Sequence, residues 1–284
     1  MTSMARAHPT PAAAPSRPTL ELSGPKLRTA LESLVVRSED YGGVERYVEA
    51  LKVKTALFGK SLGDGRARDI EPKALRQLLS LLATVRRRVG PYLTGQRFDE
   101  LREHLAALLE AATDTAAVDD AIVQFCSRYP ADREHRFVRD LAVEVLHNVD
   151  PERYPLMCRW VWDARANTGV LRELWHAADV DHVLIDVADG HATFVVLREE
   201  LSQYLTANGV FRDVLQYVDL LTAQVYAGYI AEQGGSYLRA DFAMPEDPML
   251  HTRRMLGLDL ARDGRTRLKA FDGHATIVDA PRLN

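Results

Sequence analysis

HNVDPERYPLMCRWVWDARANTGVLRELWHAADVDHVLIDVADGHATFVV, residues 147–196, is the stretch of this 284-residue chain that decides the predicted fold. It holds all three tryptophans, four of the nine histidines and one of the two cysteines. Its second half alternates apolar and polar residues, which is typical of a β-hairpin. We therefore expect the helical segments before and after it to pack around it.

The first half of this stretch predicts a buried helix. Pro155 is typical of a helix start, and a helix over about residues 155–165 would be apolar on nearly all sides, which indicates burial. Its charged residues Arg159, Asp163 and Arg165 then need partners or a site, because an isolated buried charge is costly. Arg159 and Asp163 are four residues apart, so they can pair along one face.

Two Asp-Gly dipeptides predict two hairpins. A turn at Asp189-Gly190 places three apolar pairs on one face of a hairpin, and these pairs are Val187 with Ala192, Ile185 with Phe194, and Val183 with Val196. The pentapeptide at 272–276 repeats the letters of residues 189–193. A turn at Asp272-Gly273 places Leu268 opposite Ile277 in a second hairpin.

Apolar residues three and four apart dominate the rest of the chain, which indicates helices. The predicted fold is mainly α, with a minor antiparallel β part of two hairpins in the C-terminal third, which is α+β by strict count. Residues 1–19 are rich in Ala and Pro and are expected to form a disordered tail. Residues 20–284 are expected to form a single globular domain, helical over 20–178 and mixed over 179–284.

Composition excludes some classes of function. The net charge of -4 gives no general attraction to nucleic acid or anionic membranes. No apolar run reaches the length of a membrane span. Cys126 and Cys158 lie in apolar patterns without metal-type spacing, which is typical of reduced core cysteines. We expect a soluble cytoplasmic protein.

A ligand pocket is predicted where aromatic and cationic residues gather. Aromatic walls and arginines suit phosphate or planar groups. The candidate ligand residues are Tyr154 at the rim, Trp160 and Trp162 as walls, and Arg159, Arg165 and Asn167 as anion contacts. The alternative is a structural core with an internal pair between Arg159 and Asp163. Asp163 and His191 are the weak candidates for acid–base chemistry.

No metal site is predicted. His176, His182 and His191 lie close together in sequence, with several Asp nearby, and are weak candidates for metal ligands. No established ligand motif is present, so the metal prediction is none and the cofactor is left open.

The one basic region of note spans residues 52–88. Residues 51–90 hold ten Lys or Arg against three Asp or Glu. The candidate anion or nucleic-acid contacts there are Lys60, Arg66, Arg68, Arg86, Arg87 and Arg88. The alternative, which we favour, is a solvated face, because charge runs usually lie in solvent.

These observations favour a non-catalytic binding or accessory protein that holds a protein partner or a small ligand at residues 147–196. One alternative is an enzyme that acts on a phosphorylated or nucleotide-like substrate. A second is a helical nucleic-acid-binding protein that uses residues 52–88, which the overall charge disfavours.

Overall fold

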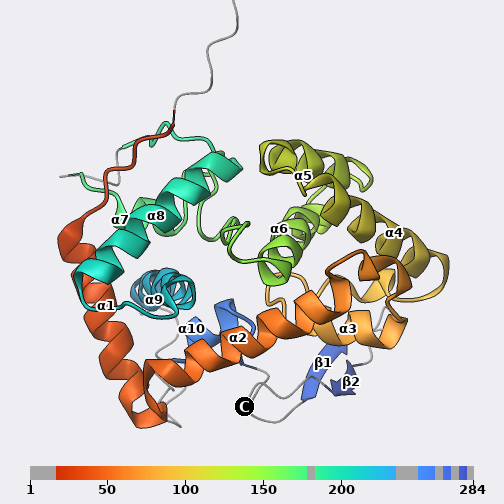
Figure 1. Ribbon diagram of the computed structural model, residues 1–284, viewed down its shortest axis with the longest axis horizontal. Coiled ribbons are helices and arrows are strands. Elements are labelled where there is room, and N and C mark those ends of the chain that lie inside the picture. The colour runs from red at the N-terminus through yellow and green to blue at the C-terminus, as the bar shows by residue number, and fades with distance from the viewer. Residues whose placement is uncertain (1–16, 178–182, 235–248, 260–264, 270–274, 280–284) are drawn as a thin grey trace, which may run out of the picture.

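The computed structural model describes residues 17–177, 183–234, 249–259, 265–269 and 275–279. Within these residues the chain forms ten α-helices and one two-stranded ribbon (Figure 1). The helices are α1 (Gly24–Ser38), α2 (Gly43–Leu62), α3 (Pro72–Ser80), α4 (Gly95–Ala111), α5 (Val118–Ser127), α6 (Phe137–Val149), α7 (Val170–Leu174), α8 (His191–Ala207), α9 (Val214–Gly234) and α10 (Leu250–Met255).

Helix α9 lies at the centre of one half of the molecule. It packs against α1, α2, α7, α8 and α10, which surround it in Figure 1. Its buried side chains include Leu220, Leu221 and Ala223, three neighbours that point in different directions around the helix. A helix with buried residues on several sides is expected to be enclosed by other helices, as α9 is.

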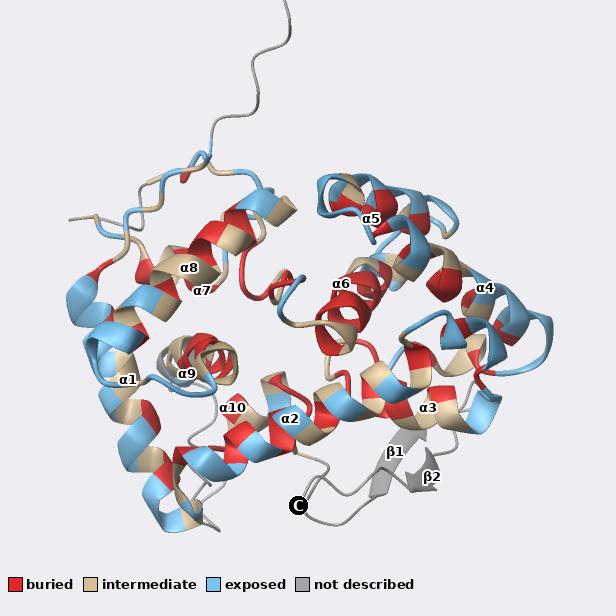
Figure 2. Ribbon diagram, viewed as in Figure 1, coloured by how far each residue is buried: buried red, intermediate tan, exposed pale blue. Residues whose placement is uncertain are grey.

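Helix α6 organises the other half. It packs against α2, α4 and α5, and nearly all of its residues are buried (Figure 2). One continuous hydrophobic core extends from Leu27 of α1 to Leu258 after α10. Helix α6 carries that core from α5 toward α9, so its polar residues lie deep inside the molecule.

The helix predicted over residues 155–165 does not form. The backbone there follows turns and short extended pieces, and its carbonyls accept from outside the segment: Val170 N donates to Trp160 O at 3.1 Å, and Leu171 N donates to Val161 O at 3.0 Å. Gly169 allows this close pairing, because its φ is 118° and a Cβ there would lie 2.7 Å from Val161 O. The apolar residues are buried as predicted, but the backbone is irregular.

The first predicted hairpin was wrong. Residues 183–190 form no strand, and the chain continues as helix α8 from His191. Two side chains from other segments explain the difference. Asp119 Oδ1 accepts a hydrogen bond from the His191 amide at 2.9 Å and so caps α8. Asn167 Nδ2 donates to Val183 O, and Asn167 Oδ1 accepts from Ile185 N. These backbone groups therefore have partners without a neighbouring strand.

The predicted β part of the fold was therefore wrong as well, and the architecture is helical. Two short strands, β1 (Arg265–Lys269) and β2 (Ala275–Asp279), pair as an isolated antiparallel ribbon. Arg267 faces Ile277 in this ribbon, whereas the predicted register placed Leu268 opposite Ile277. The turn predicted at 272–273 lies outside the described residues. The described core is built by helices and the loops between them.

Two further expectations concern the chain ends and membranes. Residues 1–16 of the predicted tail lie outside the described part, whereas Arg17 pairs with Glu199, and Ser23 N donates to Leu174 O at 2.8 Å. Among the helices that the structure describes, none combines the length and the apolar character needed to cross a membrane.

Candidate functional site

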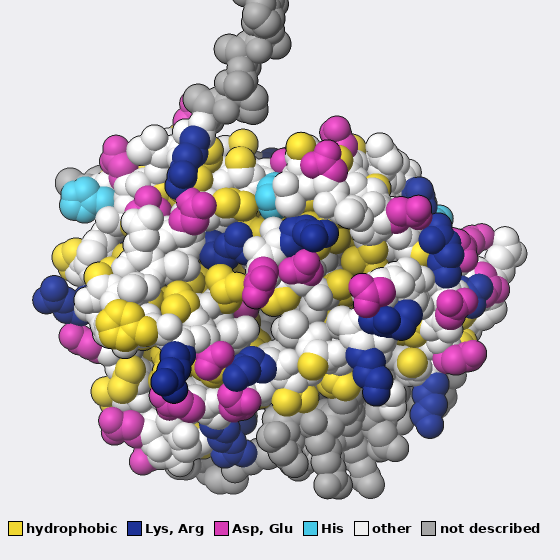
Figure 3. Space-filling model, viewed as in Figure 1, with side chains coloured by type: hydrophobic (Ala, Val, Ile, Leu, Met, Phe, Trp, Pro, Cys, Tyr) yellow, Lys and Arg dark blue, Asp and Glu magenta, His cyan; other side chains and the backbone are white. Residues whose placement is uncertain are grey.

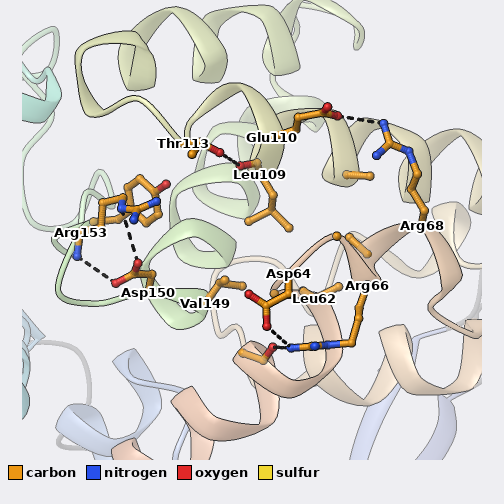
Figure 4. A pocket seen from close by; sticks show the side chains of 16 residues that line it. Leu62, Asp64, Arg66, Arg68, Leu109, Glu110, Thr113, Val149, Asp150 and Arg153 are labelled. Carbon is orange, nitrogen blue, oxygen red and sulfur yellow. Dashed lines mark hydrogen bonds and ion pairs between the residues drawn. The ribbon is translucent and has the colours of Figure 1, made fainter.

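A cavity of about 670 Å³ lies between the end of α2, the loop that follows it, α4 and the turn after α6 (Figure 4). The loop includes the short 3₁₀ helix η2 (Arg66–Asp69). The volume falls in the range of small-molecule sites. Apolar side chains contribute to the lining, and these are Leu62, Ala106, Leu109 and Val149.

Three arginines line this cavity. Arg66 Nη2 donates to Gly59 O at 2.9 Å and lies 2.9 Å from Asp64 Oδ2. Arg153 lies over the Tyr154 ring at 5.9 Å, and its Nε is 3.6 Å from Asp150 Oδ2. These contacts fix two guanidinium groups by a backbone carbonyl and an aromatic ring in addition to their carboxylates.

The third arginine, Arg68, is held by acidic side chains of α4. Its Nη2 lies 3.0 Å from Glu110 Oε2, and its Nε lies 3.7 Å from Glu103 Oε2. Two partner carboxylates reach further into solvent than their arginines: the exposed fraction is 70% for Glu110 against 49% for Arg68, and 86% for Asp64 against 48% for Arg66. Exposed pairs of this kind stabilise a protein little, so another anion can replace the carboxylate.

The local sequence explains the loop geometry. Helix α2 ends where Gly63 N donates to Gly59 O at 3.0 Å, and Asp64 and Gly65 follow with φ of 51° and 80°. Two successive left-handed residues reverse the chain, which glycine and aspartate tolerate better than most residues. Ala67 is buried, so the arginines on either side of it remain at the surface.

A second cluster of polar residues lies inside the molecule on α6. Asp140, Glu144 and His147 are four and three residues apart, so they share one face of the helix, and all three are buried. Such residues are almost never buried without partners. Lys54 of α2 is also buried, and its Nζ donates to Leu256 O at 2.8 Å.

Burial sets the protonation of Glu144 and Lys54. It raises the pKa of Glu144 to about 7, against the opposing effects of Lys54 and a hydrogen bond from Thr84. It lowers the pKa of Lys54, against the attraction of Glu144 and Asp219. Desolvation disfavours the charged form of each group, which is why the two pKa values move toward each other.

His147 joins α6 to α9. Its Nδ1 lies 2.9 Å from Tyr154 O, and its Nε2 lies 3.0 Å from Asp219 Oδ2. A carbonyl oxygen only accepts, so Nδ1 carries a proton, and a second proton lies between Nε2 and the carboxylate. Neither ring nitrogen is free, so His147 does not act as a general base in this arrangement.

Four of the predicted ligand residues lie in the core or at its edge. Arg159 pairs with Asp140 at 2.6 Å instead of Asp163, and it also donates to Arg136 O at 2.7 Å. Trp162 is fully buried, and its Nε1 donates to Val187 O at 2.9 Å. The other two are Trp160, which packs on Tyr226 with ring centroids 5.4 Å apart, and Tyr154, which donates its hydroxyl to Ala112 O at 2.8 Å.

Of the predicted ligand residues, Tyr154 lines the cavity, and the structure does not bring the others to it. Arg165 is exposed, and Asn167 holds residues 183–185. The acid–base candidates lie elsewhere as well: Asp163 Oδ1 accepts the Ala166 amide at 3.0 Å, and His191 stands at the start of α8.

The weak metal candidates do not converge within the described part of the chain. His176 is exposed, His191 has Nε2 3.4 Å from Arg153 O, and His182 lies outside the described residues. No group of three or more His, Cys, Asp or Glu among the described residues is placed to hold a metal ion. Burial also raises the pKa of the Cys158 thiol, which makes it a poor nucleophile.

The basic residues of region 52–88 divide among separate partners. Arg66 and Arg68 line the cavity, whereas Arg86 forms a bidentate pair with Asp259 at 2.8 and 2.6 Å, and Arg88 donates to Glu134 O at 3.3 Å. Lys60 and Arg87 are exposed. Figure 3 shows cationic and anionic side chains interspersed on the face in view, without a large field of one sign.

The sequence analysis did not predict two features, the cavity and the buried polar residues of α6. The cavity joins segments far apart in the chain, which no short motif reveals. The buried polar row on α6 did leave a signal, because Asp140, Glu144 and His147 interrupt an apolar helix at helical spacing. No protein-family model, curated protein or solved structure matches this chain, so its function is argued from the site alone.

Proposed function

We propose that this protein binds a small anionic molecule with an apolar body in the cavity beside residues 59–68. The observation that carries the proposal is a cavity of about 670 Å³ whose rim holds Arg66, Arg68 and Arg153 around an apolar lining. This deepens the expectation of a ligand-binding protein and moves the site from the tryptophan-rich segment to its edge at Tyr154.

The placement of the charges supports an anion. Arg66 and Arg153 are anchored by Gly59 O and by the Tyr154 ring, so they stay at the cavity when their carboxylate partners leave. Asp64 and Glu110 lie mostly in solvent, so they can turn away from an incoming anion. Arginine binds phosphate, sulfonate or carboxylate groups through two parallel hydrogen bonds.

The hydroxyl groups of the lining support binding over catalysis. Thr113 Oγ1 donates to Leu109 O at 3.3 Å, and the Tyr154 hydroxyl donates to Ala112 O at 2.8 Å. Neither has a base beside it among the residues that the structure describes, which a nucleophile of this type requires. The cavity therefore favours a holding function over covalent chemistry.

A cytoplasmic location forms part of the proposal. Cys126 and Cys158 are both free cysteines. Proteins of reducing compartments keep such thiols unpaired.

The test uses three aromatic probes of similar size and different charge: naphthalenesulfonate, naphthalenemethanol and naphthylmethylamine. We expect the anionic probe to bind more tightly than the other two, and its affinity to fall with added salt. Isothermal titration calorimetry gives the dissociation constants. Equal binding of all three probes, or preference for the cation, would contradict the proposal.

Variants locate the binding. Arg66→Ala and Arg153→Ala should each weaken naphthalenesulfonate binding about tenfold, since a charge-assisted hydrogen bond contributes about 1.5 kcal/mol or more. Arg87→Ala is the matched control, because Arg87 is an exposed arginine that does not line the cavity. Equal losses in all three variants would place the probe elsewhere.

A further inference from the structure

We infer that His147 is a positioning residue whose proton holds one wall of the cavity in place, so that ligand affinity falls as pH rises through its titration. The inference rests on the proposed function for the identity of the ligand. It concerns the turn over residues 150–154, which contributes Asp150, Arg153 and Tyr154 to the cavity.

The turn is attached to the protein at a few points. Tyr154 N donates to Asp150 O at 2.9 Å within the turn, and Asp150 N donates to Leu146 O at 3.1 Å at its start. At its end, the carbonyl of Tyr154 accepts from His147 Nδ1 at 2.9 Å. The middle is held by Arg198 of α8, whose Nη1 donates to Pro151 O and Glu152 O at 2.9 and 2.8 Å. Two further contacts are His191 Nε2, 3.4 Å from Arg153 O, and the Tyr154 hydroxyl, which donates to Ala112 O at 2.8 Å.

One of these attachments depends on a proton that the His147 ring can lose. Protonated His147 donates from both ring nitrogens, to Tyr154 O and to Asp219. A neutral ring carries one N–H and faces two acceptors, so it satisfies one of them and leaves the other buried without a donor. The hydrogen bond to the Asp219 carboxylate is charge-assisted and the stronger of the two, so the neutral ring keeps its proton on Nε2 and loses its hold on Tyr154 O.

Charged groups from four helices act on the ring. Asp219 of α9 contacts it, Lys54 of α2 and Glu144 of α6 lie near it, and Arg198 of α8 lies near Asp219. Burial opposes the charged ring, but the attraction and hydrogen bond of Asp219, with the carbonyl of Tyr154, together raise the pKa of His147 above its ordinary value. The loosening should therefore begin above about pH 6.5, the value for an exposed histidine.

Asp219→Asn is the decisive variant. The introduced amide can donate to Nε2 of a neutral ring, which leaves Nδ1–H on Tyr154 O at every pH above the histidine titration. Glu144→Gln is the matched control, because it removes a neighbouring buried carboxyl group whose pKa is about 7 and leaves the contacts of His147 in place.

The experiment measures hydrogen exchange of the Arg153 and Tyr154 amides from pH 6 to 9, corrected for intrinsic rates, and naphthalenesulfonate affinity over the same range. In the native protein and in Glu144→Gln, we expect exchange to speed up severalfold and the dissociation constant to rise severalfold. In Asp219→Asn, both should stay flat. His147→Ala should show the loose turn at every pH.

The inference is overturned if Asp219→Asn keeps the native pH dependence of exchange, or if the native protein shows none. A failure of the proposed function looks different. In that case naphthalenesulfonate binds no variant at any pH, while exchange at residues 153–154 still decides whether His147 holds the turn.

Discussion

The charges around α6 and the charges around the cavity are the same residue types in opposite surroundings. Asp140 and Glu144 are 4% and 3% exposed; Asp140 pairs with Arg159, and Glu144 accepts from Thr84 and is attracted by the buried Lys54. Two of the cavity carboxylates, Asp64 and Glu110, lie largely in solvent and pair with arginines that are about half exposed. Removing one partner leaves an uncompensated charge in the first region, whereas water replaces the partner in the second.

This contrast separates stability from binding. The interior charges contribute to stability through their buried partners, so they position helices and turns. The cavity charges contribute little to stability, so they are available to a ligand. The sequence suggested Arg159 as a ligand contact because its neighbours are aromatic. In the structure its guanidinium donates to the buried Asp140 carboxylate, so Arg159 belongs with the interior charges around α6.

The largest expected effect tests that assignment. Arg159→Ala leaves the Asp140 carboxylate buried without its partner, so the free energy of unfolding should fall by about 3–5 kcal/mol. Urea denaturation measures it. Arg165→Ala is the control from the same segment and should stay within about 0.5 kcal/mol of the native protein, because Arg165 is exposed. Similar small losses in both variants would erase the distinction between the two regions.

The next effect is the pH dependence of stability. The pKa values of Glu144 and His147 are raised in the folded state, so the folded protein holds more protons than the unfolded chain near neutral pH. Their contribution is fully present below the unfolded pKa values and is lost as pH rises through the folded ones. From Glu144 alone, with a folded pKa of about 7, the loss between pH 4.5 and 8 is on the order of 3 kcal/mol.

Thermal or urea unfolding at several pH values checks this slope. Glu144→Gln keeps a neutral side chain of the same shape and should flatten the curve. A native stability that increases steadily from pH 5 to 8 would show that Glu144 is ionised throughout and that Lys54 compensates its burial fully.

A smaller effect compares two tryptophans that the sequence places in one group. Trp162→Phe deletes the hydrogen bond to Val187 O and leaves space in a fully buried position, so it should cost about 2 kcal/mol. Trp160→Phe should cost less, because its buried Nε1 has no hydrogen-bond partner among the described residues. Chemical denaturation of both variants gives the difference, and equal costs would mean that ring volume alone decides.

The smallest effect on stability belongs to the cavity. Asp64→Asn and Glu110→Gln should leave the melting temperature unchanged, because both carboxylates are largely exposed. Each removes an acceptor that competes for an arginine, so each should strengthen naphthalenesulfonate binding about two- to fivefold. Calorimetric titration checks the affinity, and weaker binding would assign these carboxylates to the ligand instead of to the arginines.

Local pattern alone determined most of the helices. Apolar residues three and four apart predicted a mainly helical chain, and α1, α4 and α9 each turn one apolar face or more toward the core. The sequence analysis expected other segments to pack around residues 147–196, and Trp162 and its neighbours do lie within the core. Burial follows composition, so it could be predicted without knowing the backbone path.

Tertiary contacts decided the rest. The alternation in residues 183–196 favours a strand locally, but Asp119 caps the helix from His191 and Asn167 binds the backbone of residues 183–185. Both side chains are distant in sequence, so no local pattern contains them. The cavity likewise exists because α4, the loop after α2 and the turn after α6 meet there. Periodicity reports which residues avoid water, whereas partners for backbone groups and charges depend on which segments the folded chain brings together.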